Sequence, residues 1–193
     1  MKTKLKIFLF ILLCTTMSTT AMAENAAQIN AKADTVVNIF KQKHGAAKFL
    51  SEVEGYIVFP SVLKGGFFLG AEYGEGVLRV KDENKEYYSI ASGSAGFQMG
   101  AQKASYIIAF ASKRALENFR KSNGWEAGVD GTITVVDWGA AKDIASLSFE
   151  KPIYAFVFNA KGIMGGISIE GTKFTKIQPS KTAVYDEVEK YTK

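Results

Sequence analysis

The residue pair with the clearest catalytic spacing is Ser61 and Lys64, which form the pattern S-x-x-K. In penicillin-interacting enzymes this spacing places serine and lysine one turn apart at the start of a helix, so that the amine can assist the hydroxyl. Here Ser61 follows Pro60 at the end of a predicted strand, and Lys64 precedes two glycines that favour a hairpin. The S-D-N and K-T-G motifs that accompany such a serine do not occur. A hydrolase that uses Ser61 and Lys64 is therefore the weakest of three hypotheses for the function.

The chain offers few residues for other catalytic or metal chemistry. Its one histidine, His44, lies in a polar junction between two predicted helices, where we expect an exposed helix-end residue. Its one cysteine, Cys14, lies in the N-terminal segment, so we predict neither a disulfide nor a zinc site in the remainder. The phosphate-loop pattern G-x-x-x-x-G-K-[ST] does not occur. We therefore predict a protein that is not an enzyme and needs no cofactor and no metal.

Basic residues stand beside apolar ones in two predicted helices, a pattern typical of contact with an anionic membrane surface. The candidate lipid-binding residues are Lys41, Lys43, Lys48, Phe49 and Leu50 in the first group and Lys113 and Arg114 in the second. The alternative interpretation is a helix packed on a sheet with its lysines in water, and periodicity alone favours it. In the second group the cations occupy the first helical turn, where they oppose the helix dipole.

The residues from 24 to 54 have helical spacing. The apolar residues of the first half recur at intervals of three and four: Ile29, Ala33, Val36, Val37 and Phe40. This spacing predicts an amphipathic helix, which Gly45 interrupts. Apolar residues of a second short helix follow at Ala46, Phe49, Leu50 and Val53, and Gly55 ends the helical region.

The residues from 55 to 178 form short β-rich runs separated by turn signals about every ten residues. These runs are Tyr56–Phe59, Gly66–Tyr73, Val77–Val80, Tyr87–Ala91, Ala95–Gln102, Ser105–Ala111, Thr132–Val136, Ile153–Phe158, Gly166–Glu170 and Lys173–Ile177. One helix interrupts them; Ser112 can cap it, Ala115, Leu116 and Phe119 face inward, and it ends near Asn123. Residues 179–193 are expected to form a tail, with a short helix or frayed chain from Thr182 to Tyr191.

These elements predict an α+β fold. N-terminal helices pack on a glycine-rich antiparallel sheet, which is curved into a sandwich or barrel and carries one inserted helix. All 18 glycines lie between Gly45 and Gly171, and a small, strongly curved sheet needs glycine at its bends. We expect residues 24–193 to be a single domain.

Residues 1–23 have the features of a secretory signal peptide. Lys2, Lys4 and Lys6 precede the apolar run IFLFILL, and the segment ends Ala21-Met-Ala23. Leu13 stands before Cys14, where a lipoprotein needs a small residue, so lipidation is not expected. Those three lysines supply most of the net charge of +5, so the remaining chain is close to neutral. It also contains no basic run long enough to follow a nucleic acid backbone. We expect a disulfide-free globular protein that is periplasmic or otherwise exported and peripheral to a membrane.

Segments spread from about Ala31 to Ile177 resemble one known family. They are Gly55–Pro60, Lys64–Phe67, Gly70–Leu78, Tyr88–Ser92, Gly96–Gln102, Ala115–Phe119, Gly124–Gly128, Val135–Asp137, Gly139–Ala141, Tyr154–Phe158 and Lys161–Gly162. Together their spacing resembles the SYLF domain. The resemblance implies a lipid-binding module: eukaryotic members bind phosphoinositide membranes and some bind actin, whereas bacterial members are exported and resemble lipid- or fatty-acid-binding envelope proteins.

The resemblance also gives the first basic group a role. In eukaryotic members a lysine-rich amphipathic helix before the sheet helps to hold the membrane, and Lys41–Leu50 occupies the matching place. His44 and Gly45 break that helix here, so headgroup selectivity is not carried over. Phosphoinositides and actin are not carried over either, because a bacterial envelope normally lacks both.

Three hypotheses follow from the sequence. The first is a non-enzymatic exported protein that recognises anionic phospholipid or fatty acyl chains, with lysines on phosphate and apolar residues on the chain. The second is an envelope protein-interaction or scaffolding module with Trp125 or Trp138 as anchors. The third is the hydrolase that uses Ser61 and Lys64.

Overall fold

The computed structural model describes residues 24–66, 69–95, 100–141, 143–147, 149–161 and 169–180. The predicted signal peptide, the stretch from Thr182 to Tyr191 and most of the run Gly166–Glu170 lie outside these residues. The helices are α2 (Ala26–Lys41), α3 (Ala46–Glu52), α4 (Lys113–Lys121) and the 3-10 helix η1 (Ile144–Ser146). The strands are β1 (Gly55–Gly66), β2 (Leu69–Val80), β3 (Glu83–Ala95), β4 (Gly100–Phe110), β5 (Trp125–Glu126), β6 (Thr134–Val136), β7 (Ile153–Lys161) and β8 (Lys173–Ile177).

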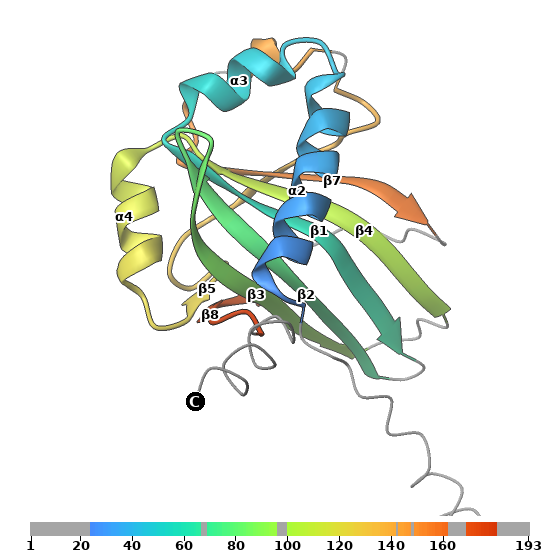
Figure 1. The fold of residues 1–193 in the computed structure, drawn as a ribbon. Coiled ribbons are helices and arrows are strands. Elements are labelled where there is room, and N and C mark those ends of the chain that lie inside the picture. The colour runs from blue at the N-terminus through green and yellow to red at the C-terminus, as the bar shows by residue number, and fades with distance from the viewer. Residues whose placement is uncertain are drawn as a thin grey trace, which may run out of the picture.

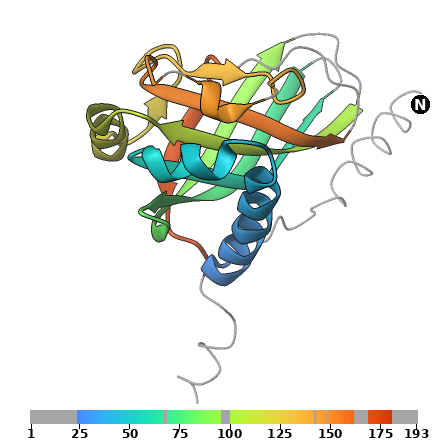
Figure 2. The same ribbon diagram turned by 90° about the horizontal axis from the view of Figure 1, so that it is seen from above.

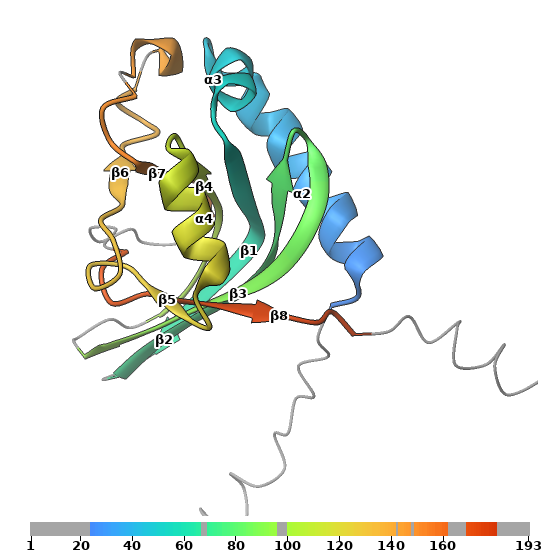
Figure 3. The same cartoon turned by 90° about the vertical axis from the view of Figure 1, so that its left-hand side faces the viewer.

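The strands form one sheet of order β5-β8-β3-β2-β1-β4-β7-β6, which curls into a half-barrel (Figure 1). Neighbouring strands are antiparallel except β6 and β7, which run parallel. Helix α4 lies on the inner side of the curl, whereas α2 and α3 lie on the outer side (Figure 3). The predicted α+β fold is therefore confirmed: N-terminal helices pack on a curved, glycine-rich sheet with one inserted helix.

Each face of the sheet has its own hydrophobic core. The inner core joins Phe59, Ile108 and Phe174 of the strands to Leu116 and Phe119 of α4. The outer core joins the buried side chains of α2 and α3 to strands β1, β2, β4 and β7. Because strand side chains alternate between faces, a sheet that is covered on both sides needs apolar residues at nearly every position of its central strands. The burial of all six residues from Gly55 to Pro60 in β1 shows this pattern.

Helix α2 begins with a capping box. The Asn25 side chain accepts a hydrogen bond from the backbone N–H of Gln28 at 2.9 Å, and the Gln28 side chain accepts one from the backbone N–H of Asn25 at 3.1 Å. The predicted apolar stripe is confirmed, since Ile29, Ala33, Val36, Val37 and Phe40 are all buried. The stripe fixes the helix on the outer face of the sheet.

The break between α2 and α3 is the point where the helix pair contacts η1. Gly45 has a left-handed φ of 76°, and a Cβ atom there would lie 2.3 Å from the backbone nitrogen of Ala145. The His44 carbonyl accepts a hydrogen bond from Ile144, and its imidazole lies 3.0 Å from Asp143. The junction therefore docks on η1, and the two helices meet at a sharp angle, as Figure 2 shows from above. His44 itself is exposed, as expected.

The strand predictions are correct in most of the sheet and wrong in several details. The predicted runs Gly66–Tyr73 and Ala95–Gln102 each combine the end of one strand with the start of the next, because Gly66 ends β1 and Ala95 ends β3. Strand β8 has the predicted bounds, and β2 joins two predicted runs into one strand. Strand β5 was not predicted, β6 is parallel to its neighbour, and Ile169 and Glu170 lie outside any strand. In α4, Leu116 and Phe119 are buried as predicted, but the Ser112 side chain makes no capping hydrogen bond. Among the described residues, no helix is long and apolar enough to cross a membrane.

Proline at position 60 creates a bulge in β1, which lies between β2 and β4 at the centre of the sheet. Proline has no N–H to donate to a neighbouring strand, so inside a sheet it occurs at bulges. The register shifts here on both sides of β1, between Val58 and Ser61 against β2 and between Phe59 and Val62 against β4. Ser105 of β4 donates a hydrogen bond to the Pro60 carbonyl at 3.0 Å. The strand is continuous through the bulge, so Ser61 does not end a strand as the sequence suggested.

Glycine is needed in β2 opposite this bulge. A Cβ atom on Gly76 would lie 2.4 Å from the carbonyl oxygen of Val58 and 2.6 Å from the ring of Phe59. Real Cβ atoms do not approach backbone so closely, so a side chain at this position would force β1 and β2 apart.

We predict that Gly76→Ala lowers the free energy of unfolding by roughly 1–3 kcal/mol, the usual cost of overpacking a core. Gly93→Ala in β3 is the matched control, because a Cβ atom there would meet nothing within 4 Å. Urea unfolding of both variants checks the prediction, and an equal effect of the two substitutions would contradict it.

Candidate functional site

A groove of about 570 Å³ lies between α2 and the strands β1, β4 and β7. Its lining residues are Lys32, Thr35, Val36, Ile39, Pro60, Ser61, Lys103, Ala104, Ser105, Asn159 and Ala160. This volume is within the range of small-molecule and cofactor sites. The groove is the candidate functional site.

Two irregularities of the sheet border this groove. One is the bulge at Pro60 in β1. The other lies at the β4–β7 pair, where the register shifts between Lys103 and Ser105 and Asn159 adopts a left-handed φ of 54°. Bulges bend a strand and redirect its side chains, and they occur frequently beside functional sites. Both irregularities therefore lie in strand segments whose residues line the groove.

Apolar atoms form most of the groove, and two lysines stand at its margin. Val36 and Ile39 of α2 face Pro60 and Ala160 of the strands. Lys32 lies on α2, where it forms a 2.6 Å ion pair with Glu24, and Lys103 is exposed on β4. An apolar channel with ammonium groups at its edge suits a ligand with a hydrocarbon part and an anionic part.

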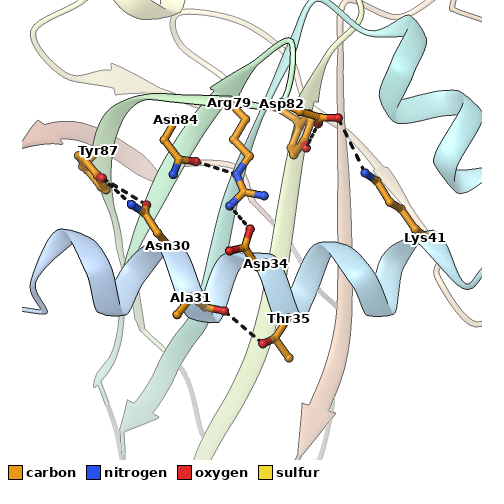
Figure 4. A network of polar contacts seen from close by, with 10 residues as sticks. Asn30, Ala31, Asp34, Thr35, Lys41, Arg79, Asp82, Asn84 and Tyr87 are labelled. Atoms are coloured by element: carbon orange, nitrogen blue, oxygen red, sulfur yellow. Dashed lines mark hydrogen bonds and ion pairs between the residues drawn. The ribbon is translucent and has the colours of Figure 1, made fainter.

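The opposite side of α2 is held to the sheet by a polar network (Figure 4). The guanidinium of Arg79 on β2 is buried; it donates hydrogen bonds to Asp34 at 2.7 Å and to Asn84 at 2.9 Å. The amide of Asn30 and the hydroxyl of Tyr87 form a further contact on the same side. These bonds fix α2 on its β2–β3 side and leave its other side over the groove.

The first group of predicted lipid-binding residues has partners inside the fold. Phe49 and Leu50 are buried in the outer core, where Phe49 stacks on Phe149 at 5.4 Å. Lys43 lies 4.4 Å above the ring of Trp138 and donates to its carbonyl. Lys41 is 3.9 Å from Asp82, and Lys48 is 3.7 Å from Glu52. The lipid contact of these residues stays a prediction, and Phe49 and Leu50 would have to leave the core to make it.

The second group lies elsewhere. Lys113 and Arg114 are exposed in the first turn of α4, which covers the inner core, whereas α3 covers the outer one. The structure therefore does not bring the two predicted groups together, and neither of them lines the groove. Contact of Lys113 and Arg114 with lipid also stays a prediction.

Strand geometry separates the predicted catalytic pair. Ser61 lines the groove on the outer face, whereas Lys64 lies on the inner face, where it is opposite Glu72. Residues three apart in a strand point to opposite faces, so the amine cannot assist this hydroxyl. The hydrolase hypothesis thus loses its candidate site. Among the described residues, no cluster of histidine, cysteine and carboxylate groups could hold a metal ion.

The two tryptophans that were predicted as anchors for a protein partner are also part of the fold. Trp125 is 3% exposed and packs against Phe119 and Phe174 in the inner core. Trp138 is half-buried and stacks on Phe40 and Phe158.

The inner face carries a buried carboxylate near the groove end of the sheet. Glu72 of β2 accepts hydrogen bonds from the hydroxyls of Tyr106 on β4 and Ser92 on β3, and Lys64 on β1 is the cation that faces it. Burial raises the pKa of Glu72, and the two hydroxyls and Lys64 only partly oppose this shift. Burial and the nearby Glu72 carboxylate also raise the pKa of Tyr106.

A second carboxylate shifts in the opposite direction. Glu86 of β3 pairs with Arg120 of α4 and Lys176 of β8, each at 2.9 Å, and accepts a hydrogen bond from Tyr88 at 2.7 Å. Burial alone would raise its pKa, but these three donors lower it to about 2. This cluster ties the inserted helix to the strands on which it packs.

Sequence reasoning missed Lys32 and Lys103 because each is an isolated lysine in an ordinary amphipathic segment. One signal was present: Pro60 stands inside a strongly apolar run, and proline inside a central strand indicates a bulge. The groove itself combines residues from Lys32 to Ala160, 128 positions apart in the sequence, and no local pattern reveals this.

A curled sheet with a helix-covered apolar groove and a lysine margin defines a ligand-binding or surface-binding domain. The family model Ysc84, described as Las17-binding protein actin regulator, matches residues 91–192, more than half of the chain. The chain therefore belongs to this family, the SYLF-domain family that its sequence resembles, and it is a member of a family of binding domains. No curated protein matches the chain.

We predict opposite pH effects for the two carboxylates. The folded pKa of Glu72 lies above its unfolded value near 4.5, so its contribution to stability falls as the pH rises above that value. Glu72→Gln should therefore raise the free energy of unfolding at pH 7. The folded pKa of Glu86 is about 2, so its stabilising contribution is present above pH 4.5 and is lost as the pH falls towards 2.

Glu86→Gln is the matched comparison and should lower the free energy of unfolding at pH 7. Urea unfolding of both variants between pH 3 and pH 8 measures how the change in the free energy of unfolding caused by each substitution depends on pH. If the effects of the two substitutions change with pH in the same direction, the raised pKa of Glu72 and the lowered pKa of Glu86 are not both correct.

Proposed function

We propose that this protein is a non-enzymatic, exported lipid-binding protein that holds the acyl chain of a fatty acid or anionic phospholipid in the groove between α2 and the sheet. The observation that supports this most strongly is the composition of the groove, with apolar side chains along it and Lys32 and Lys103 at its margin. Membership in a family of binding domains agrees with a binding role.

The apolar part of the ligand supplies most of the binding free energy in this proposal. Burial of hydrocarbon against Val36, Ile39, Pro60 and Ala160 contributes roughly 25 cal/mol per Å² of apolar surface. The carboxylate or phosphate then lies near an ammonium group of Lys32 or Lys103, where the partly exposed charge pair adds a smaller amount and a preferred direction.

Export and a position peripheral to a membrane belong to the same proposal. The positive start, apolar run and A-x-A end of residues 1–23 support export. A ligand that is sparingly soluble in water also favours a carrier close to a membrane.

A protein-interaction or scaffolding role is the second candidate. The description of the family names the binding of a protein, Las17, and regulation of actin. A partner of this chain would have to contact exposed surface, because Trp125 is buried and Trp138 is half-buried and stacked.

We predict that Thr35→Trp abolishes oleate binding, measured by isothermal titration calorimetry, because the indole would fill the groove from the exposed face of α2. Ala47→Trp is the matched control: Ala47 is also exposed and helical, but it lies on α3 and does not line the groove. Unchanged oleate affinity of Thr35→Trp would refute the proposed site.

We also predict that Lys103→Glu weakens oleate binding by about tenfold, which corresponds to about 1.4 kcal/mol. Lys48→Glu tests the alternative location on α3. If Lys48→Glu weakens oleate binding and Lys103→Glu does not, the lysine-rich helix is the binding site and the groove is not.

A further inference from the structure

The sheet has an outer-face area that none of the described residues covers. Strands β1, β2, β3 and β4 run beyond the end of α2 towards their connections (Figure 1). On this part of the outer face, Leu63 of β1 is 58% exposed and Tyr73 of β2 is 51% exposed. They are direct partners in the β1–β2 ladder, so their side chains stand next to one another.

Small uncharged residues continue this surface on both sides of the pair. Ala91 is the ladder partner of Tyr73 on β3. Two residues further along each strand, on the same face, Gly65 of β1 pairs with Ala71 and Ala101, and Ala71 pairs with Gly93. All five of these residues are exposed. A Cβ atom on Gly93 would meet nothing within 4 Å, so the space above the sheet is open at that point. We call these seven residues the outer apolar face. Exposed large apolar residues that lie together on a surface indicate an interaction site.

Positive charge borders the outer apolar face where it meets the groove. Lys103 of β4 is exposed, is the ladder partner of Leu63 and also lines the groove. Ser61 continues the same face of β1 from Leu63 into the groove. One acidic group is close: Glu75 accepts hydrogen bonds from Tyr73 at 2.8 Å and from the backbone of Glu24 at 3.1 Å.

We propose that the outer apolar face docks on an anionic lipid bilayer, with Leu63 and Tyr73 inserted among the lipids and Lys103 on their phosphates. The positive charge of Lys103 at the border is complementary to such a surface, and tyrosine is enriched at the interface between lipid and water. This proposal rests on the proposed function, because it places the groove entrance at Ser61 and Lys103 directly against the source of its ligand. Lipid then enters the groove without crossing water.

The test measures binding of the purified protein to vesicles of phosphatidylglycerol and phosphatidylcholine, and separately to vesicles of phosphatidylcholine alone, by co-sedimentation. The double variant Leu63→Ser with Tyr73→Ser should bind the anionic vesicles at least tenfold more weakly than the original protein. It should still bind free oleate with unchanged affinity, because neither residue lines the groove. Lys103→Gln should reduce the dependence of vesicle binding on salt concentration.

Val129→Ser is the matched control, because Val129 is 74% exposed but lies in the loop between β5 and β6. Its vesicle binding should be unchanged. If the double variant does not fold, Leu63→Trp gives an independent measurement. Brominated lipids in anionic vesicles should quench the fluorescence of the indole introduced at position 63. They should not quench the indole introduced by Ala47→Trp.

Two results would overturn this proposal. The first is undiminished vesicle binding by the folded double variant. The second is a change from dimer to monomer in the double variant, seen by analytical ultracentrifugation, which would show that a second copy of the chain covers this face. Failure of the proposed groove function is a separate result. In that case Thr35→Trp leaves oleate binding unchanged, while the double variant still shows weakened binding to anionic vesicles.

Discussion

The missing N–H of Pro60 is the constraint on which most of this structure depends. Before the bulge, Ile57 and Phe59 of β1 face the inner core; after it, Val62 faces inward and Leu63 outward. A strand without the bulge would have the opposite alternation, with Lys64 in water and Leu63 in the core. The extra residue therefore places Lys64 opposite Glu72 and Leu63 beside Tyr73. The same bulge places Pro60 and Ser61 in the lining of the groove.

The two faces of the sheet are held by different kinds of interaction. On the outer face the apolar stripe of α2 supplies burial, and Arg79 with Asp34 fixes its direction. On the inner face Glu86 joins α4 to β8 through two cations, in a setting that stabilises its ionised form. Glu72 is the exception, since its surroundings favour the protonated form. A group that is costly to bury and yet is retained by three strands is more typical of a functional region than of a core.

Local patterns were enough to predict what local interactions determine. The helical spacing from Ile29 to Phe40 predicted α2 and its buried face, and the run Lys173–Ile177 predicted β8 to the residue. The parallel pairing of β6 depends on the chain crossing to the far edge of the sheet, and Trp125 joins β8 only through the fold. The groove brings Lys32 of α2 together with Lys103 and Ala160 of distant strands, and no periodicity contains that information. Phe49 and Leu50 show that a local pattern can also be ambiguous. A lysine-rich amphipathic segment has the same pattern whether its apolar side faces lipid or a protein core, and here these two residues are buried in the core.

The edges of the half-barrel are very short. Strand β5 at one edge has two residues and strand β6 at the other has three, whereas the four central strands have eleven to thirteen. A sheet that ends in long, unpaired strands offers its free N–H and C=O groups to any other extended chain and so promotes fibrous aggregation. Here β1 and β2 are paired on both sides along nearly their whole length, whereas β3 pairs with β8 only from Tyr87 to Ala91. The fold thus carries an exposed apolar surface on its outer face, while its outermost strands, β5 and β6, are too short to pair with a further strand over more than two or three residues.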